Sequence, residues 1–152
     1  MPELRFTHLD DYNWQEVRAL EDADGNRLVA REKWPEFSPE RLAVYAEWSP
    51  GMVVHRHGHE SEQVVFVLEG EVTIDGRPCP AGTYMVLEQG ASMGPMIAGP
   101  EGVRLFEMMM GDPRSWEADP EEFASVLAER GLKKLPNPPI EMPEWRPDTR
   151  ST

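Results

Sequence analysis

The sequence predicts an all-β domain, an antiparallel sandwich or barrel, followed by one helix and a proline-rich tail. Short runs of β-branched and aromatic residues alternate with a period of two, which is typical of strands with one buried face. These runs recur at roughly 8–12-residue spacing and are separated by glycine-containing turns, as in sandwiches and barrels. The 152 residues suffice for one domain with a sizeable core. Within it we expect N-terminal strands that pack on the barrel (1–39), a barrel core (40–112), and a helix with its tail (113–152).

The N-terminal part begins with a predicted hairpin. Residues 17–20 and 27–31 are strand-like and flank Asp24-Gly25-Asn26, a sequence typical of tight turns. The next segment, 41–48, alternates apolar and polar residues and ends at Ser49-Pro50-Gly51. Two hairpin strands and one amphipathic strand are therefore expected before the first glycine-rich turn.

The barrel core contains further short strands. Strand-like runs follow one another along the chain at 63–68, 71–74, 83–87 and 103–110. Glycine- or proline-containing turns separate them at 75–76, 80–82 and 99–102. The sequence thus predicts a turn at Gly99-Pro100-Glu101-Gly102, before the last clear strand.

One helix is predicted near the C-terminus. Asp119 is a good N-cap, and Pro120 suits the first helical position. Phe123, Val126 and Leu127 then form an apolar stripe, and Gly131 ends the helix. We expect the helix to lie outside the barrel.

The tail after the helix, 135–147, is too rich in proline to join a sheet interior. It also carries Ile140, Met142 and Trp145, which are too apolar for a purely disordered segment. We expect the tail to pack on the barrel or on a second subunit.

Composition restricts the possible partners. The chain has 28 acidic and 15 basic residues, a formal net charge of −13, which disfavours binding to nucleic acid or to an anionic membrane. No apolar run approaches the roughly 20 residues of a membrane span, and the N-terminus does not resemble a secretion leader. Cys79 is the single cysteine, so an internal disulfide is excluded. A cytoplasmic protein is expected.

The segment from Gly51 to Gly70 carries the chemistry. His55, His57 and His59 occupy alternate positions, and alternate side chains of a strand share one face. Gln63 opens the next strand as a polar residue before an apolar run. Two parallel imidazoles and a nearby amide oxygen favour a site for a transition metal.

The spacing of Gly51, His57, His59, Gln63 and Gly70 resembles the first motif of the cupin superfamily, with glutamine where glutamate is usual. This resemblance covers roughly residues 40 to 110. It implies a double-stranded β-helix, that is, a cupin or jelly-roll barrel. It also implies one divalent first-row ion (Fe, Mn, Ni, Zn or Cu), a small-molecule ligand or substrate, and a homodimer.

The second cupin motif is only partly present. It can be placed on Gly82, Glu88, Gly90 and Met93, with Glu88 where proline is usual and Met93 where the fourth ligand, a histidine, is usual. Three interpretations of Met93 remain open. It packs while three ligands hold the metal; or the metal site is lost; or the thioether binds copper, since it is a soft ligand.

The remaining candidates have alternative interpretations as well. His57, His59 and Gln63 could simply form hydrogen bonds inside the barrel without a metal. His55 would orient a ligand, bind substrate or act as an acid–base group, or it lines the barrel without a role. Glu88 is the other candidate acid–base group and a possible replacement ligand.

The sequence thus favours a mononuclear metal-dependent enzyme of dioxygenase or isomerase type that acts on a small carbonyl, enol or aromatic compound. The ion would chelate the substrate through its open positions. The alternative is a non-catalytic ligand-binding or sensor barrel with a decayed metal site.

Overall fold

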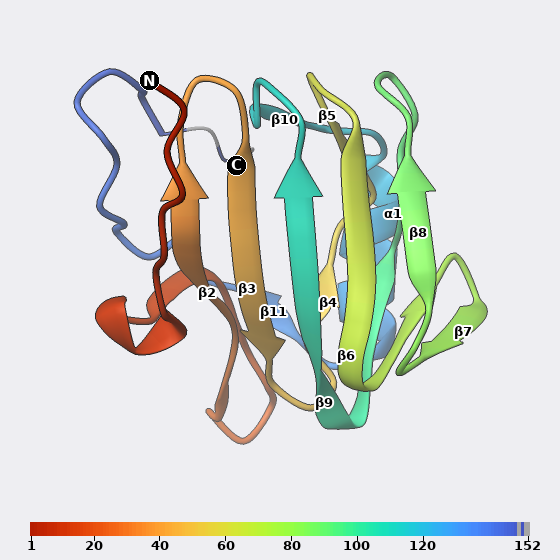
Figure 1. Ribbon diagram of the computed structural model, residues 1–152. Coiled ribbons are helices and arrows are strands. Elements are labelled where there is room, and N and C mark those ends of the chain that lie inside the picture. The colour runs from red at the N-terminus through yellow and green to blue at the C-terminus, as the bar shows by residue number, and fades with distance from the viewer. Residues whose placement is uncertain (149, 151–152) are drawn as a thin grey trace.

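The computed structural model describes residues 1–148 and 150, and it is built almost entirely from antiparallel strands (Figure 1). In chain order the strands are β1 Gln15–Glu21, β2 Arg27–Phe37, β3 Leu42–Trp48, β4 Val53–Val54, β5 His57–His59, β6 Gln63–Ile74, β7 Arg77–Pro80, β8 Tyr84–Leu87, β9 Met96–Met109, β10 Ser115–Glu117 and β11 Lys133–Lys134. A short 3₁₀ turn, η1 Leu9–Asp11, precedes them, and one helix, α1 Pro120–Glu129, lies between β10 and β11.

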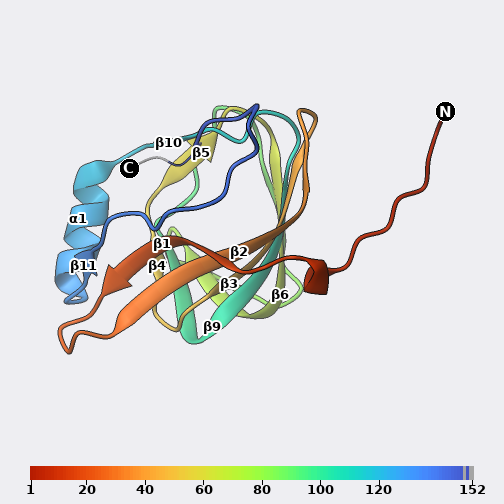
Figure 2. The same cartoon turned by 90° about the vertical axis from the view of Figure 1, so that its left-hand side faces the viewer.

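Nine strands form one curled sheet in the order β11-β1-β2-β3-β9-β6-β7, with β4 paired to β9 and β8 paired to β6. Strands β10 and β5 form a separate two-stranded ribbon at one end (Figure 2). The predicted all-β double-stranded β-helix with one C-terminal helix is confirmed. The hairpin of β1 and β2 is confirmed as well, with Gly25 at φ +83° in its turn.

The turn predicted at 99–102 is wrong, because β9 runs through it as one bent strand. Its partner β6 bends at the same place: residues 63–70 pair with 103–109, and 72–74 pair with 96–98. Both strands therefore pass from one side of the barrel to the other without losing their pairing. Gly70 and Gly102 sit at this corner with positive φ, and a Cβ on Gly70 would collide with the carbonyl oxygen of Gly102. Glycine here permits a bulged corner rather than a chain reversal.

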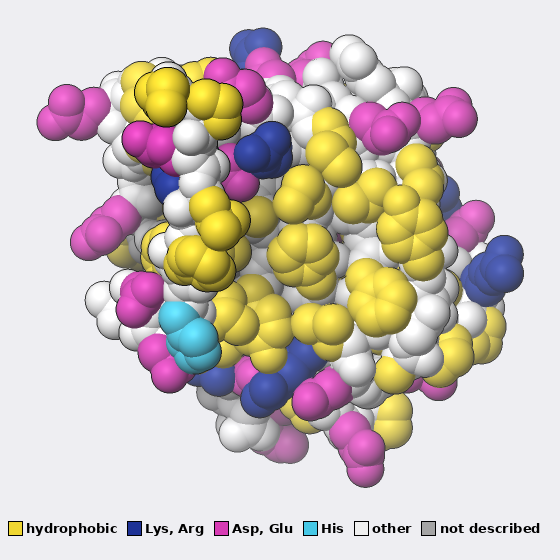
Figure 3. Space-filling model, in the orientation of Figure 1, with side chains coloured by type: hydrophobic (Ala, Val, Ile, Leu, Met, Phe, Trp, Pro, Cys, Tyr) yellow, Lys and Arg dark blue, Asp and Glu magenta, His cyan; other side chains and the backbone are white. Residues whose placement is uncertain are grey.

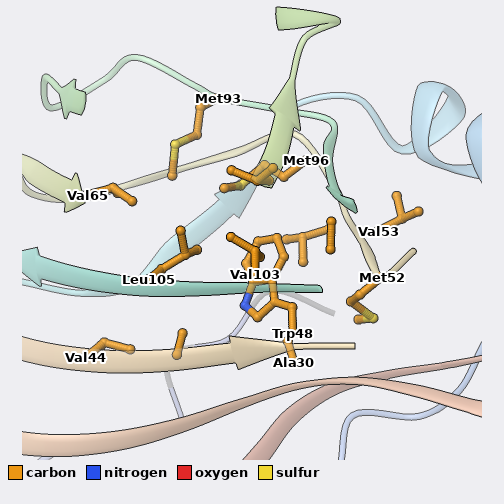
Figure 4. Close-up of a cluster of buried hydrophobic side chains, with 14 of the residues drawn as sticks. Ala30, Val44, Trp48, Met52, Val53, Val65, Met93, Met96, Val103 and Leu105 are labelled. Atoms are coloured by element: carbon orange, nitrogen blue, oxygen red, sulfur yellow. The ribbon is translucent and has the colours of Figure 1, made fainter. Parts of the chain in front are cut away.

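The core fills the barrel interior and follows the strand alternation (Figure 4). On β3, Val44, Ala46 and Trp48 are all at most 5% exposed, whereas Tyr45 and Glu47 between them are half-buried. The largest fully buried side chains are Leu20, Met52, Met96, Leu105, Gln63, Val44, Val53, Val65, Val67 and Val72. One member of this set, Gln63, is polar, and it lies at the candidate site.

The helix α1 covers one side of the barrel as predicted. Asp119 caps it by accepting a hydrogen bond from the backbone N–H of Glu122 at 2.9 Å, and Pro120 is at the first turn. Leu127 is buried, and Phe123 and Val126 pack against the core. None of the helices in the described part of the chain is long and apolar enough to cross a membrane.

The proline-rich tail packs on its own barrel. The backbone N–H of Leu135 donates to the carbonyl of Ala19 at 3.1 Å, which extends the sheet edge next to β1. The Trp145 ring meets Phe37 edge to face, with ring centroids 5.4 Å apart. Arg150 donates to the carbonyl of Val17 at 3.0 Å. The tail was expected to pack on the barrel or on a second subunit, and these contacts are with the barrel.

Candidate functional site

Strand β5 and the start of β6 bring His57, His59 and Gln63 to the wall of one cavity of about 100 Å³. Strand β5 is held on one side by β10 and on the other by a two-hydrogen-bond bridge to Met93. Gly58, between the two histidines, packs so closely on Trp116 of β10 that a Cβ would overlap the indole ring. The missing side chain therefore lets β10 fix the direction of both imidazoles.

In both imidazoles, Nε2 is the nitrogen whose lone pair is available to bind a metal ion. His57 Nδ1 lies 2.8 Å from the carbonyl oxygen of His55, and His59 Nδ1 lies 2.9 Å from that of Pro113. Because a carbonyl oxygen only accepts, each Nδ1 carries the proton and each Nε2 keeps its lone pair. The ring centroids are 5.2 Å apart and the rings are nearly perpendicular, at 82°.

Burial keeps these histidines neutral. It lowers the pKa of His57 to about 3, with a smaller contribution from the neighbouring His59. Burial also lowers the pKa of His59, although the hydrogen bond to Pro113 opposes the shift. Neutral imidazole is the form that binds metal, so the pair needs no deprotonation at pH 7.

Gln63 supplies an unsatisfied acceptor. Its side chain is 1% exposed, and its amide Nε2 donates to Glu107 Oε1 at 3.0 Å. Among the described residues, nothing donates a hydrogen bond to Gln63 Oε1. A buried acceptor without a partner is costly, so it indicates a missing donor or cation at this position.

Glu107 of β9 and Glu32 of β2 add two carboxyl groups to the same cavity. Burial, with a smaller contribution from the charge of Glu32, raises the pKa of Glu107 to about 8. Burial also raises the pKa of Glu32, which accepts a hydrogen bond from Trp34 Nε1 at 2.9 Å. A carboxyl group with a pKa near neutrality can donate or accept a proton under physiological conditions.

Sequence reasoning did not assign Glu107 a role. The strand pattern places Glu107 on the same face of β9 as Leu105 and Met109. From the sequence, however, either face of that strand could have faced the barrel interior. In the structure all three residues are at most 7% exposed, so the face that carries Glu107 points into the barrel. Arg18 of β1, which also lines the cavity, was missed because its strand gave no comparable pattern.

The two candidate acid–base residues lie elsewhere. His55 is 2% exposed, and its ring packs against Phe123 at 5.5 Å and against His57 at 5.1 Å between centroids, behind the cavity wall. Burial lowers its pKa to about 3. Glu88 is exposed in the turn after β8 and does not line the cavity. These positions give no support to an acid–base role for either residue.

Met93, at the expected fourth ligand position, packs in the core. It is 8% exposed and lies with Val65 and Met96 in the buried cluster shown in Figure 4. Its backbone N–H donates to the carbonyl of His57 at 2.9 Å, and it accepts one hydrogen bond in return at 3.0 Å. Met93 does not line the cavity, so its side chain contributes to packing and its backbone positions β5.

The donor set fits a metal ion with three protein ligands. In the described part of the chain, no group of three or more His, Cys, Asp or Glu side chains is arranged to hold an ion. His57, His59 and Gln63, with two neutral imidazoles and an unpaired amide oxygen, nevertheless line one cavity, and imidazole suits Zn, Cu, Fe and Ni. Such a set adds no negative charge, so a divalent ion there would keep its formal charge.

Structural comparison finds barrels of the same fold. The polyketide cyclase RemF from Streptomyces resistomycificus matches with a TM-score of 0.60 and 19% identity over 84% of this chain and 94% of its own. An acetylacetone dioxygenase from Acinetobacter johnsonii matches with a TM-score of 0.58 and 14% identity, covering 79% and 80%. The Rhodobacter sphaeroides complex of SigE with the anti-sigma ChrR matches with a TM-score of 0.52 and 18% identity, covering 67% of this chain and 51% of that chain.

Sequence comparison assigns the family. No curated protein matches the chain. The family model described as the ChrR cupin-like domain matches residues 5–110, which include every strand from β1 to β9 and all three proposed ligands. The chain therefore belongs to the ChrR cupin-like domain family of the cupin superfamily.

Proposed function

We propose that this cupin binds one divalent first-row transition metal through His57 Nε2, His59 Nε2 and Gln63 Oε1. The observation that carries the proposal is the buried Gln63 oxygen, which has no hydrogen-bond partner among the described residues and lies on the same cavity as two imidazoles with free lone pairs. A network that only hydrogen-bonded internally would satisfy that oxygen.

The cavity favours a small, partly apolar ligand. Its apolar wall is formed by Phe37, Leu42, Val54, Met96, Met109 and Ile140. The polar groups lie at discrete points of this wall, as is usual for sites that orient a small molecule. A carbonyl, enol or aromatic compound has the matching combination of an apolar body and one or two oxygen atoms.

We further propose that the site is catalytic, of dioxygenase or isomerase type. The metal would supply Lewis-acid polarisation of an oxygen-bearing substrate. The protein would bind the substrate against the apolar wall, and Glu107, with its pKa raised to about 8, would exchange a proton with the bound molecule. Glu107 is positioned for this by its hydrogen bond to the Gln63 amide.

Metal content of the purified protein tests the first step. We expect a stoichiometric first-row metal by elemental analysis, and its loss in the double variant His57→Ala/His59→Ala. Gln63→Leu should weaken binding without abolishing it, because two imidazoles remain. His8→Ala is the matched control, since His8 is exposed and lies before β1. Metal retained in the double variant, or absent from the native protein, would contradict the proposal.

A second candidate is a non-catalytic ligand-binding or sensor barrel. The packing of Met93 in the core favours it, because this position then contributes no fourth ligand. It predicts a metal-free protein whose thermal stability is unchanged by chelator. Copper binding that is weakened by Met93→Leu, with the fold intact, would instead indicate a rearranged copper site.

A further inference from the structure

One row of paired residues crosses β1, β2 and β3 on the wall of the candidate cavity. Arg18 pairs with Ala30, and Ala30 pairs with Trp48. Paired residues of neighbouring strands place their side chains on the same face of the sheet, and all three line the cavity. Two strand spacings, about 10 Å, separate the backbones of Arg18 and Trp48. Because Ala30 has no side chain beyond Cβ, it leaves room between the guanidinium and the indole ring. We call these residues the Arg18–Ala30–Trp48 row.

Trp48 offers a hydrogen-bond donor to this space. It is 5% exposed, and among the described residues nothing accepts a hydrogen bond from its indole Nε1. Figure 4 shows this nitrogen on the edge of the ring toward Val44 and Leu105, inside the barrel. Trp34 on the same cavity differs, because its Nε1 donates to Glu32 at 2.9 Å. A buried donor without a partner is costly, so Trp48 indicates an acceptor that comes from a bound molecule.

Arg18 makes the same space electropositive. Burial, with a smaller contribution from Arg150, lowers the pKa of Arg18 to about 10. The carboxylates of Glu32, Glu117 and Asp148 act in the opposite direction and offset this shift only in part. The guanidinium therefore stays charged at pH 7, but its surroundings stabilise the charge less than water does, so a further anion beside it is favourable. A guanidinium has several N–H donors, enough for protein groups and a ligand together.

The charge of Arg18 also acts on the proposed metal ligands. In addition to burial, it contributes to the lowered pKa values of His57 and His59. Because interactions between charges weaken with distance, this effect places Arg18 and the two imidazoles within the span of one small molecule.

Polar groups inside this barrel contrast with the outer side of the same strands. Figure 3 shows hydrophobic side chains over the outer surface of β3, β9 and β6. The same three strands contribute Trp48, Glu107 and Gln63 to the cavity wall. Antiparallel sheets more often bury apolar side chains and expose polar ones, so buried polar groups call for a specific explanation. Orientation of a bound molecule is such an explanation.

We propose that the Arg18–Ala30–Trp48 row binds a carboxylate group of the ligand, with one oxygen accepting from Trp48 Nε1 and the other facing the Arg18 guanidinium. This carboxylate site rests on the small-molecule site proposed above, and it narrows the ligand class to small carboxylic acids. A carbonyl or enol oxygen of the same molecule would then face the proposed metal ligands, and its apolar body would contact the apolar wall.

The indole N–H resonance of Trp48 tests the contact. The probes are acetate and benzoate, added to the full chain with EDTA present, and benzamide is the neutral counterpart of benzoate. In proton–nitrogen correlation spectra assigned with Trp48→Phe, we expect both carboxylates to move the Trp48 indole resonance. Those of Trp14 and Trp145, which do not line the cavity, should stay in place. No shift with either carboxylate, or an equal shift with benzamide, would overturn the proposal.

Calorimetric titration of the protein as purified with benzoate tests the two side chains. Arg18→Gln should raise the dissociation constant by about 10-fold or more, and Trp48→Phe by about 5-fold, because a charge-assisted contact and a neutral hydrogen bond are lost. Arg27→Gln is the matched control, since it removes the same charge from the same hairpin at an exposed residue outside the cavity. Circular dichroism verifies folding, and Arg18→Lys, which keeps the charge, replaces Arg18→Gln if that variant does not fold; it should bind benzoate more weakly than the native protein. Benzoate affinity equal to that of Arg27→Gln in both Trp48→Phe and the Arg18 variant would refute the row.

The carboxylate site and the metal site can fail separately. Elemental analysis decides on the metal site, whereas the Trp48 resonance in EDTA does not depend on a metal. Benzoate that binds only in the absence of EDTA, without effect on Trp48, would place the carboxylate on the metal and refute the row. A Trp48 shift in a protein that contains no metal would support the row and contradict the metal proposal alone.

Discussion

The buried His55 makes stability depend on pH in a way that can be calculated. His55 is 2% exposed, and burial lowers its pKa from 6.5 to about 3. In the unfolded chain the same imidazole takes up a proton near pH 6.5. Between these two values the unfolded state binds more protons than the folded state, so acidification favours unfolding. The penalty is small above pH 6.5 and grows until the pH approaches 3.

The magnitude follows from the shift. At pH 5, about 1.5 units below the pKa of this imidazole in the unfolded chain, proton binding stabilises the unfolded state relative to the folded state by about 2 kcal/mol. At pH 7 the corresponding contribution is only ~0.2 kcal/mol. His55→Gln removes this proton-binding site. Between pH 7 and pH 5, the loss of unfolding free energy should therefore be about 2 kcal/mol smaller in His55→Gln than in the native protein.

Urea unfolding at the two pH values measures this difference, with EDTA present so that bound metal adds no pH dependence of its own. The neighbouring His57 and the buried Glu107 titrate in both proteins, so their contributions largely cancel in the comparison. His8→Gln, at a histidine whose side chain is 74% exposed, is the control and should behave as the native protein does. If His55→Gln shows the native pH dependence within about 0.5 kcal/mol, the reasoning fails.

Two further predictions concern the support of the site. Gly58→Ala would force a methyl group into the Trp116 ring and should cost about 1–3 kcal/mol of unfolding free energy, with weaker metal binding because both flanking histidines shift; unchanged stability and metal content would contradict this. Asp119→Ala removes the cap on the Glu122 N–H and should cost about 1 kcal/mol in urea unfolding, whereas Asp119→Asn, which keeps an acceptor, should cost little.

Much of the fold was predictable because the signals were local. The turn at residues 24–26 predicted the first hairpin, and the alternation of 41–48 predicted the strand β3, in which Val44, Ala46 and Trp48 are buried. The start of the helix followed from Asp119 and Pro120, whose backbone and hydrogen-bonding preferences act over a single turn. Each of these features depends on neighbours only a few residues away.

The features that escaped prediction depend on distant parts of the chain. Gly99–Gly102 has the composition of a turn, but its conformation is imposed by pairing with β6, which continues across the same corner. Glu107 could not be assigned to the cavity until the opposite strands decided which side of β9 faces inward. The site itself was better predicted: His57, His59 and Gln63 do line one cavity, whereas binding of a metal there stays a prediction.

The tail gives this barrel a second source of variation. Ile140 and Arg150 reach the cavity wall from a segment that lies beyond the family match at residues 5–110. Substitutions in that segment can reshape the pocket without disturbing the strands that hold the imidazoles. The ligand preference proposed for this site therefore depends on the C-terminal segment as well as on the strands that carry His57, His59 and Gln63.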